Sequence, residues 1–429
     1  MLSLDPKHPT KSLLGTFATW KVFLLAIVLG SSVGPAYDTS STLLSPEIAS
    51  SNESVFDLVT KLTRWDSIYF IQNARRGYFF EQEWAFGSGL PAVISFFVQL
   101  LSTIGIEAHG SLEPLIGIFV AHISHLLSVL VLYQLGLVVS KNQRLSFVAA
   151  LLHVFSPAGL FLSAPYNESP YALLSFTGYL FFAKGLLGNT RTFAHDVSIV
   201  ASGMWFGFAT TFRSNGLFNG IPFAVALAQE LSAAPTLSSV RRRLALVIGG
   251  SAIAIGFAVP QLTAYLTYCS GRSGAEVRPW CTSYFPSIYS FVQEHYWNVG
   301  FLRYWTLPNI PLFLLAAPML YILIQSSLGF IRQPLTFVAK KFNLVNSSHL
   351  PMLIQSMAVS QLILAVLAIS NYHIQIITRI ASGYPLWYWW VAGQVSDTKT
   401  SAFGSNVVRF MVMYAVIQGA LFASFLPPA

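Results

Sequence analysis

Apolar runs of roughly 20 residues recur along the whole chain, and this pattern restricts the fold more than any other feature. A helix of that length can span a bilayer because it satisfies all of its own backbone hydrogen bonds. The runs are continuous rather than alternating, which argues against a β-barrel. Only 9% of the residues are charged, against about 25% in soluble domains. The sequence therefore predicts an all-α polytopic membrane protein.

The first apolar run covers residues 17–34 and is either a cleaved signal peptide or a retained signal anchor. Its length favours the anchor, and Lys7, Lys11 and Lys21 place the N-terminus in the cytosol. The further runs lie at 115–139, 145–163, 170–188, 197–211, 216–229, 244–268, 303–325, 350–371, 378–394 and 404–426. No soluble domain of useful size fits between them, so residues 1–429 are expected to form a single transmembrane domain.

The basic loops indicate the orientation of these helices. Lys and Arg gather at 141–144, 184–191, 241–243, 332–341 and 399, which are expected to be cytosolic. The opposite, lumenal side then holds the segments 164–169, 212–215 and 372–377 and two longer loops, 35–88 and 269–302. If the run 89–106 crosses the membrane, the basic residues Lys141 and Arg144 fall on the lumenal side. We therefore expect this run to lie along the membrane or to re-enter. This topology gives about eleven crossings, or about eight if short runs do not span.

Charge and motif content exclude several classes of function. The net charge is +8, but the basic residues form no continuous stripe, so nucleic-acid binding is not expected. The chain has no Walker-type loop, dinucleotide fingerprint, zinc spacing or Asp-x-Asp pair, so neither a metal, a cofactor nor a nucleotide-sugar donor is expected. Cys269 and Cys281 form a disulfide if their loop faces an oxidising lumen, or else remain free thiols. A glycosylation sequon begins at Asn52.

The stretch Arg64–Phe70 (RWDSIYF) places one carboxylate among aromatic residues in the first long loop. A partly desolvated Asp66 can take a proton from an attacking hydroxyl, which makes it a candidate general base. The structural alternative is a helix cap or an ion-pair partner for Arg64. The sequence alone does not decide between these two interpretations.

Other unusual polar residues fall on the same predicted face. Glu168 either contacts an acceptor sugar or is an ordinary polar residue at the membrane interface. Arg213 either holds a phosphate or extends its charge to the membrane interface. The aromatic segment Tyr384–Trp390 lines an isoprenoid groove or stacks on sugars, unless it belongs to an interfacial belt. Such a collection on one face indicates a shared aqueous cavity. The candidate binding residues are Arg64, Trp65, Glu83, Trp84, Asn167, Glu168, Arg213, Asn215 and Trp387.

Five segments together resemble the GPI mannosyltransferase 2 (PIG-V-like) family, and in length the chain is similar to fungal members. They are Arg64–Phe70, Gln82–Phe86 (QEWAF) followed by Pro91, Ser163–Ser169 (SAPYNES), Arg213–Gly216 (RSNG) and the aromatic segment that ends at Trp390. They span most of the chain in the expected order. Gln82 departs from the His expected before Glu-Trp-Ala-Phe, so no role is assigned to that side chain.

The resemblance implies a GT-C-type glycosyltransferase of the endoplasmic reticulum. Its members add the second mannose, in α1,6 linkage, from dolichyl-phosphate mannose to the glycosylphosphatidylinositol (GPI) precursor. A β-linked donor that gives an α product requires inversion, with Asp66 as the base and Arg213 steadying the leaving phosphate. The proton is taken by Asp66 alone or shared with Glu83 or Glu168. Fungal members are also expected to work with a small membrane partner subunit.

Three other interpretations remain at this stage. A lipid or solute transporter also places polar residues in an apolar bundle, but no internal repeat is visible and the charges cluster at one face. A related dolichol-dependent mannosyltransferase, of the N-glycan pathway or of another GPI step, differs only in the specific motifs. A non-catalytic subunit that has kept the fold is the third alternative.

Overall fold

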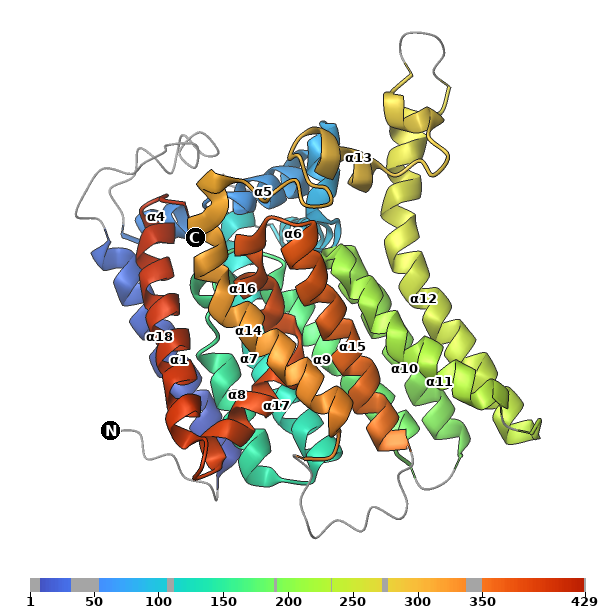
Figure 1. Ribbon diagram of the computed structural model, residues 1–429. Coiled ribbons are helices and arrows are strands. Elements are labelled where there is room, and N and C mark those ends of the chain that lie inside the picture. The colour runs from blue at the N-terminus through green and yellow to red at the C-terminus, as the bar shows by residue number, and fades with distance from the viewer. Residues whose placement is uncertain are drawn as a thin grey trace.

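The computed structural model describes residues 8–31, 54–105, 112–188, 191–232, 234–271, 277–336 and 349–427. Within these ranges all regular structure is helical, and the long helices form one bundle (Figure 1). The predicted all-α fold is therefore confirmed. Asn52 and the rest of the segment 35–53 that precedes α4 lie outside the described residues.

Six helices of the described chain are long and apolar enough to cross a membrane. They are α1 (Pro9–Gly30), α7 (Leu112–Ser140), α12 (Leu237–Tyr268), α14 (Ile310–Arg332), α15 (His349–Ser370) and α18 (Ser401–Ala423). Two further helices of 19 and 20 residues, α9 (Glu168–Leu186) and α10 (Phe193–Phe212), run within the same bundle (Figure 1). The chain is therefore a multi-pass membrane protein.

Three of the predicted crossings are short helices joined to irregular backbone. The helices α8 (Gln143–Val154), α11 (Gly220–Ser232) and α17 (Pro385–Ser396) have 12, 13 and 12 residues. At 1.5 Å per residue each is roughly 20 Å long, shorter than the roughly 30 Å hydrocarbon core. Eleven continuous spanning helices is therefore too high a count for the described residues, and about eight fits better.

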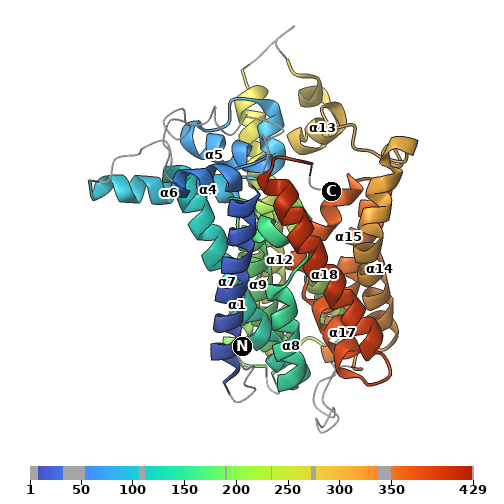
Figure 2. The ribbon, with the colours of Figure 1, turned by 90° about the vertical axis from the view of Figure 1, so that its left-hand side faces the viewer.

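The helix α6 (Gly89–Thr103) leaves the bundle almost at right angles to the long helices (Figure 2). Its side chains Phe96, Phe97 and Leu100 are exposed, with Phe96 at 61%. An apolar helix in this orientation adds no crossing to the bundle. The structure thus confirms the prediction that the run 89–106 does not cross with the others.

Lys21 lies inside the bundle rather than at the membrane border. Its Nζ donates hydrogen bonds to the Leu162 carbonyl oxygen at 2.8 Å and to Ser163 Oγ at 2.7 Å. Lys21 is therefore not a flanking charge, and its use as a marker of orientation was wrong. The side chain instead fixes the start of the segment 163–169 against α1.

The aromatic segment Tyr384–Trp390 belongs largely to the core. Trp387, Tyr388 and Trp389 have no exposed surface, and the Trp387 indole donates to the Ala381 carbonyl oxygen at 2.8 Å. The rings of Trp387 and Tyr388 stack with centroids 3.7 Å apart. The prediction that Trp387 lines a substrate groove is therefore wrong, because neighbouring helices of the bundle enclose the ring completely.

Glycines bring α10 and α12 into backbone contact. A Cβ at Gly203 would overlap the backbone of Gly249, and a Cβ at Gly256 would overlap that of Gly207. Small residues of this kind let membrane helices approach closely. The upper end of the bundle in Figure 1 carries α4 (Ser54–Leu62), α5 (Asp66–Arg76) and α13 (Ile288–His295), and the 3-10 helix η1 (Glu81–Phe86) packs against α5 and α13.

Candidate functional site

A cavity of about 470 Å³ lies where these elements meet. It is bordered by α5, η1, the segment before α9, the end of α10, α12, α13 and residues 372–380. The segments predicted to share one face of the membrane therefore do border a common space. Six of the candidate site residues line it: Trp65, Asp66, Trp84, Asn167, Arg213 and Asn215.

Tyr166 holds the turn that presents Asp66. The backbone N–H of Asp66 donates to the Tyr166 hydroxyl at 3.1 Å, and that hydroxyl donates to the Arg64 carbonyl oxygen at 3.0 Å. Burial, followed by the nearby Asp66 carboxylate, raises the pKa of Tyr166, so its hydroxyl stays protonated and keeps both hydrogen bonds. Trp65 takes a left-handed conformation with φ 56°, which turns the chain into α5.

Asp66 is not a capping side chain, because the N-cap position of α5 is Trp65. Its carboxylate lies in the first turn of α5, where the helix dipole favours a negative charge. The side chain is 32% exposed, and its Oδ2 accepts a hydrogen bond from Arg379 Nη2 at 2.9 Å. No hydrogen bond from the described residues occupies Oδ1.

Two carboxylates and two guanidiniums form a continuous chain of ion pairs. Arg379 Nε lies 3.2 Å from Glu168 Oε1, and Arg213 Nη1 donates to the same oxygen at 2.8 Å. The Glu168 side chain is fully buried, so the two arginines offset the cost of removing its charge from water. The chain Asp66–Arg379–Glu168–Arg213 thus links four charges of alternating sign from four segments of the sequence.

Asn167 joins the walls of the cavity. Its Nδ2 donates to the carbonyl oxygens of Phe86 and Phe212 at 2.8 and 2.7 Å. Its Oδ1 is buried and forms no hydrogen bond with the described residues. Asn215 is held by the hydroxyls of Tyr171 and Tyr384, both at 3.1 Å. Both amides are therefore fixed in position at the cavity surface.

Residues 16–429 match the family model described as Mannosyltransferase (PIG-V). The chain belongs to the PIG-V mannosyltransferase family. GPI mannosyltransferase 2 of Chaetomium globosum is 53% identical, over 98% of this chain and 97% of that protein. The protein of the same name from Gibberella zeae is 48% identical over 99% of both chains. The Schizosaccharomyces pombe protein is 32% identical over 85% of this chain and 73% of its own length.

Among solved structures, the chain is similar to the oligosaccharyltransferase of Archaeoglobus fulgidus. The crystal structure of its complex with zinc and sulfate gives a TM-score of 0.46 at 16% identity and covers 95% of this chain. The structure of AglB with an inhibitory peptide and a dolichol-phosphate gives 0.41 at 15% identity. The chain spans a little over half the length of these neighbours.

The other four candidate residues do not line the cavity. Arg64 is buried with its guanidinium 4.9 Å from the Phe425 ring, and Glu168 lies behind the two arginines. Glu83 accepts hydrogen bonds from Arg76 and from the backbone N–H groups of residues 79 and 80 within its own loop. Trp387 is in the core. These four side chains therefore lie outside the cavity.

Sequence reasoning missed Arg379, which lies on the short helix α16 (Ile377–Ile380). Its guanidinium packs over the rings of Phe161 and Tyr166, 4.5 and 5.3 Å from their centroids. The sequence does contain a signal for this residue, because Arg379 is a lone charge in the apolar run 378–394. A charge in a membrane segment is costly unless it is paired, and it therefore marks a candidate functional site.

The described site offers two kinds of chemistry side by side. A partly exposed carboxylate with one unoccupied oxygen can accept a proton, and Arg213 and Arg379 supply positive charge on the same cavity wall. Guanidiniums bind phosphate oxygens through paired hydrogen bonds. Transfer of a group from a phosphate-linked donor to a hydroxyl requires a proton acceptor close to a phosphate-binding site, and Asp66 with the two arginines provides both.

Proposed function

We propose that this PIG-V family mannosyltransferase adds the second mannose, in α1,6 linkage, to the GPI precursor. The donor is dolichyl-phosphate mannose, and the site faces the lumen of the endoplasmic reticulum in a GT-C-type bundle. The chain of charges Asp66–Arg379–Glu168–Arg213, of which all but Glu168 line the cavity, carries this proposal, because it combines a base with a phosphate site. The relatives named GPI mannosyltransferase 2 support the pathway.

In the proposed reaction, the acceptor hydroxyl attacks the anomeric carbon of mannose from the face opposite the phosphate. The new glycosidic C–O bond forms as the bond between the anomeric carbon and the phosphate oxygen breaks, which inverts the configuration. The hydroxyl proton goes to Asp66 Oδ1, and the electron pair leaves with dolichyl phosphate. Arg213 and Arg379 balance the negative charge of the leaving group.

The proposed reaction makes no demand for a metal ion, since the leaving group is a single phosphate that the two guanidiniums can match. Addition of a chelator is therefore expected to leave transfer unchanged. Glu83 has no share in the proton transfer, because its oxygens accept hydrogen bonds within its own loop. A small membrane partner subunit stays a prediction.

Depletion in the host tests the proposal. The depleted cells should accumulate a GPI precursor that carries one mannose, and Asp66→Asn should not rescue them despite normal expression. The matched control is Asp57→Asn, since Asp57 is about half exposed and pairs with Lys61 on α4. Full rescue by Asp66→Asn would exclude Asp66 as the base. Accumulation of a truncated N-glycan precursor would assign the protein to the N-glycan pathway instead.

A further inference from the structure

One part of the cavity surface consists of carboxamides and rings rather than ion pairs. Gln261 on α12, Tyr289 and Gln293 on α13, and His373 and Gln375 before α16 all line the cavity. We call these five residues the carboxamide wall. None of them was a candidate from the sequence, and the proton-transfer and phosphate roles above leave them without a function.

Hydrogen bonds orient two of the three carboxamides and leave their amino groups unused. Gln261 Oε1 accepts from Ser287 Oγ at 3.0 Å and from the backbone N–H of Tyr289 at 3.2 Å. Gln375 Oε1 accepts from the Tyr304 hydroxyl at 2.9 Å. The Nε2 atoms of both, and the whole Gln293 carboxamide, form no hydrogen bond with described residues. The wall therefore presents donors for a ligand that is rich in hydroxyl oxygens.

Aromatic rings stand beside these donors. Trp84 and Trp297 also border the cavity, and Trp297 packs edge-on against Phe86 with centroids 5.3 Å apart. His373 stacks on Tyr304 at 4.7 Å and hydrogen-bonds the Trp297 carbonyl oxygen at 2.9 Å. Carboxamides next to flat rings suit a sugar, whose hydroxyl groups bond to amides while its C–H faces pack on rings.

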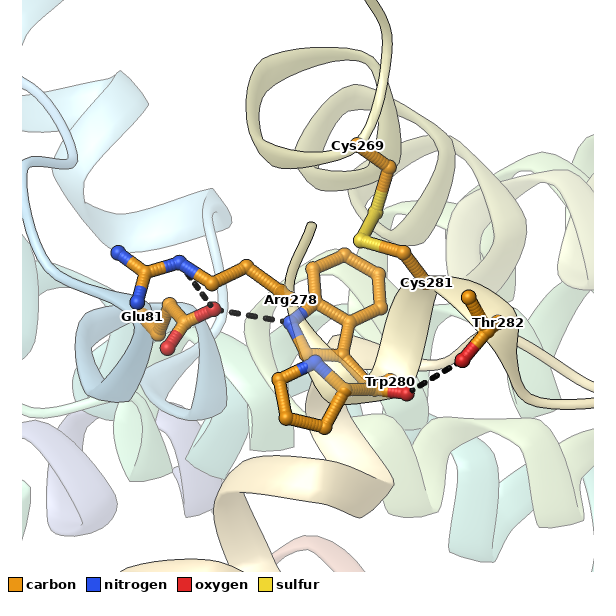
Figure 3. The surroundings of a disulfide bond; sticks show 7 residues. Glu81, Cys269, Arg278, Trp280, Cys281 and Thr282 are labelled. Carbon is orange, nitrogen blue, oxygen red and sulfur yellow. Dashed lines mark hydrogen bonds and ion pairs between the residues drawn. A yellow bond between two sulfur atoms is a disulfide. The ribbon is translucent and has the colours of Figure 1, made fainter. Parts of the chain in front are cut away.

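A disulfide and a buried carboxylate hold α13 in place. Cys269 and Cys281 are bonded, and the neighbouring Trp280 donates to Glu81 Oε1 at 2.9 Å (Figure 3). Trp280 also packs in one apolar cluster with Trp84 and with Ile288 of α13. The wall is thus attached to η1 and is formed before a ligand arrives, which lowers the entropic cost of binding.

We propose that the carboxamide wall binds the glycan of the acceptor lipid, an inference that rests on the proposed function. The donor carries one sugar ring, which must lie beside Asp66, but a cavity of about 470 Å³ is larger than one ring needs. The acceptor carries several rings, and only its reacting hydroxyl has to reach Asp66. The remaining rings need neutral, hydrogen-bonding surface, which the wall supplies.

Steady-state kinetics of Gln293→Ala and Gln375→Ala test this inference. The assay uses microsomes, labelled dolichyl-phosphate mannose and a synthetic acceptor lipid that carries glucosaminyl-inositol and one mannose. Each variant should raise the KM for the acceptor about 3- to 10-fold, the effect of one neutral hydrogen bond, and leave the KM for the donor unchanged. Gln99→Ala, at an exposed position on α6, is the matched control and should change neither value.

The outcomes separate the two proposals. A raised KM for the donor alone, or no change in either KM, would overturn the assignment of the wall to the acceptor while leaving the proposed function intact. If the wild-type protein transfers no mannose to this acceptor, the proposed function itself fails, and the inference fails with it. Gln293→Asn keeps the carboxamide, so if Gln293→Ala is poorly expressed, a several-fold rise in acceptor KM for Gln293→Asn still supports the wall and an unchanged KM contradicts it.

Discussion

Replacement of Arg379 by glutamine should damage both folding and activity, because this side chain contacts two carboxylates. The lost contact with Glu168 leaves a fully buried carboxylate with Arg213 as its remaining guanidinium partner. Removal of one partner from a buried ion pair costs about 3–5 kcal/mol when the other charge is left alone, and less here because Arg213 keeps its contact with Glu168. The lost contact with Asp66 adds only about 0–1 kcal/mol, since that carboxylate is one-third exposed and water can solvate it. We therefore expect about 2–4 kcal/mol of destabilisation.

The effect of Arg379→Gln on activity should be larger than its effect on stability. Removal of one preorganised group that stabilises developing charge typically lowers kcat about 10²–10³-fold. Microsomal transfer from labelled donor to synthetic acceptor measures kcat, and thermal retention of folded protein in detergent measures stability. Arg379→Lys keeps the charge but cannot bridge both carboxylates, so it should fall between wild type and Arg379→Gln on both measures.

The double variant Arg379→Gln/Glu168→Gln shows whether stability depends on the whole chain of charges. It removes the buried carboxylate but leaves Arg213, whose side chain is only 15% exposed, without its ion-pair partner, so thermal stability should stay below that of wild type. Activity should stay low, because the positive charge beside Asp66 is still missing. Near-normal kcat in either Arg379→Gln variant would refute the role assigned to the chain of charges.

Four shorter predictions concern the surroundings of the site. Glu83→Gln should reduce the amount of folded protein in detergent, because four hydrogen bonds, two from Arg76 and two from the backbone N–H groups of residues 79 and 80, depend on its carboxylate. Cys281→Ser should raise the acceptor KM more than it lowers kcat, and a reducing agent should have the same effect on wild type. Trp387→Phe should lower thermal stability by about 1–3 kcal/mol with both KM values unchanged. Burial and then the Asp66 carboxylate raise the pKa of Tyr69 in the folded protein. The unfolded chain therefore ionises first as the pH rises above about 10, and the folded protein should lose stability there. This loss of stability should be smaller in Tyr69→Phe.

The sequence predicted the membrane class and the grouping of the polar segments, since both depend on local signals. Apolar runs report burial in lipid, and basic loops report orientation, without knowledge of how helices pack. Lys21 shows the limit of this reasoning. Its position near the start of a run resembles a flanking charge, but its hydrogen bonds to residues 162 and 163 form across more than 140 positions of sequence.

The same limit explains which site residues were found. Asp66 and Arg213 stand in loops between apolar runs, where a charge is easily noticed. Arg379 and Gln261 lie within runs that are otherwise mostly apolar, and their importance comes from partners far away in the sequence. The prediction for Trp387 was wrong because a cluster of aromatic residues has the same sequence pattern whether it lines a groove or packs in the core.

The errors share one physical origin, which is that the bundle is irregular where the cavity lies. Short 3-10 segments replace regular helix near the start of two predicted crossings, at Ser214–Asn219 and Ala381–Gly383, and a third lies in the preceding loop at Ile374–Ile376. Non-helical backbone at membrane depth persists only where protein buries it or where it lines a water-filled space. Each break therefore has to lie against the interior of the bundle, and there it can place side chains such as Asn215 and Arg379 at angles that a continuous helix does not offer. In a chain of this kind, a predicted span that is too short or contains one charge is the place to search for the site.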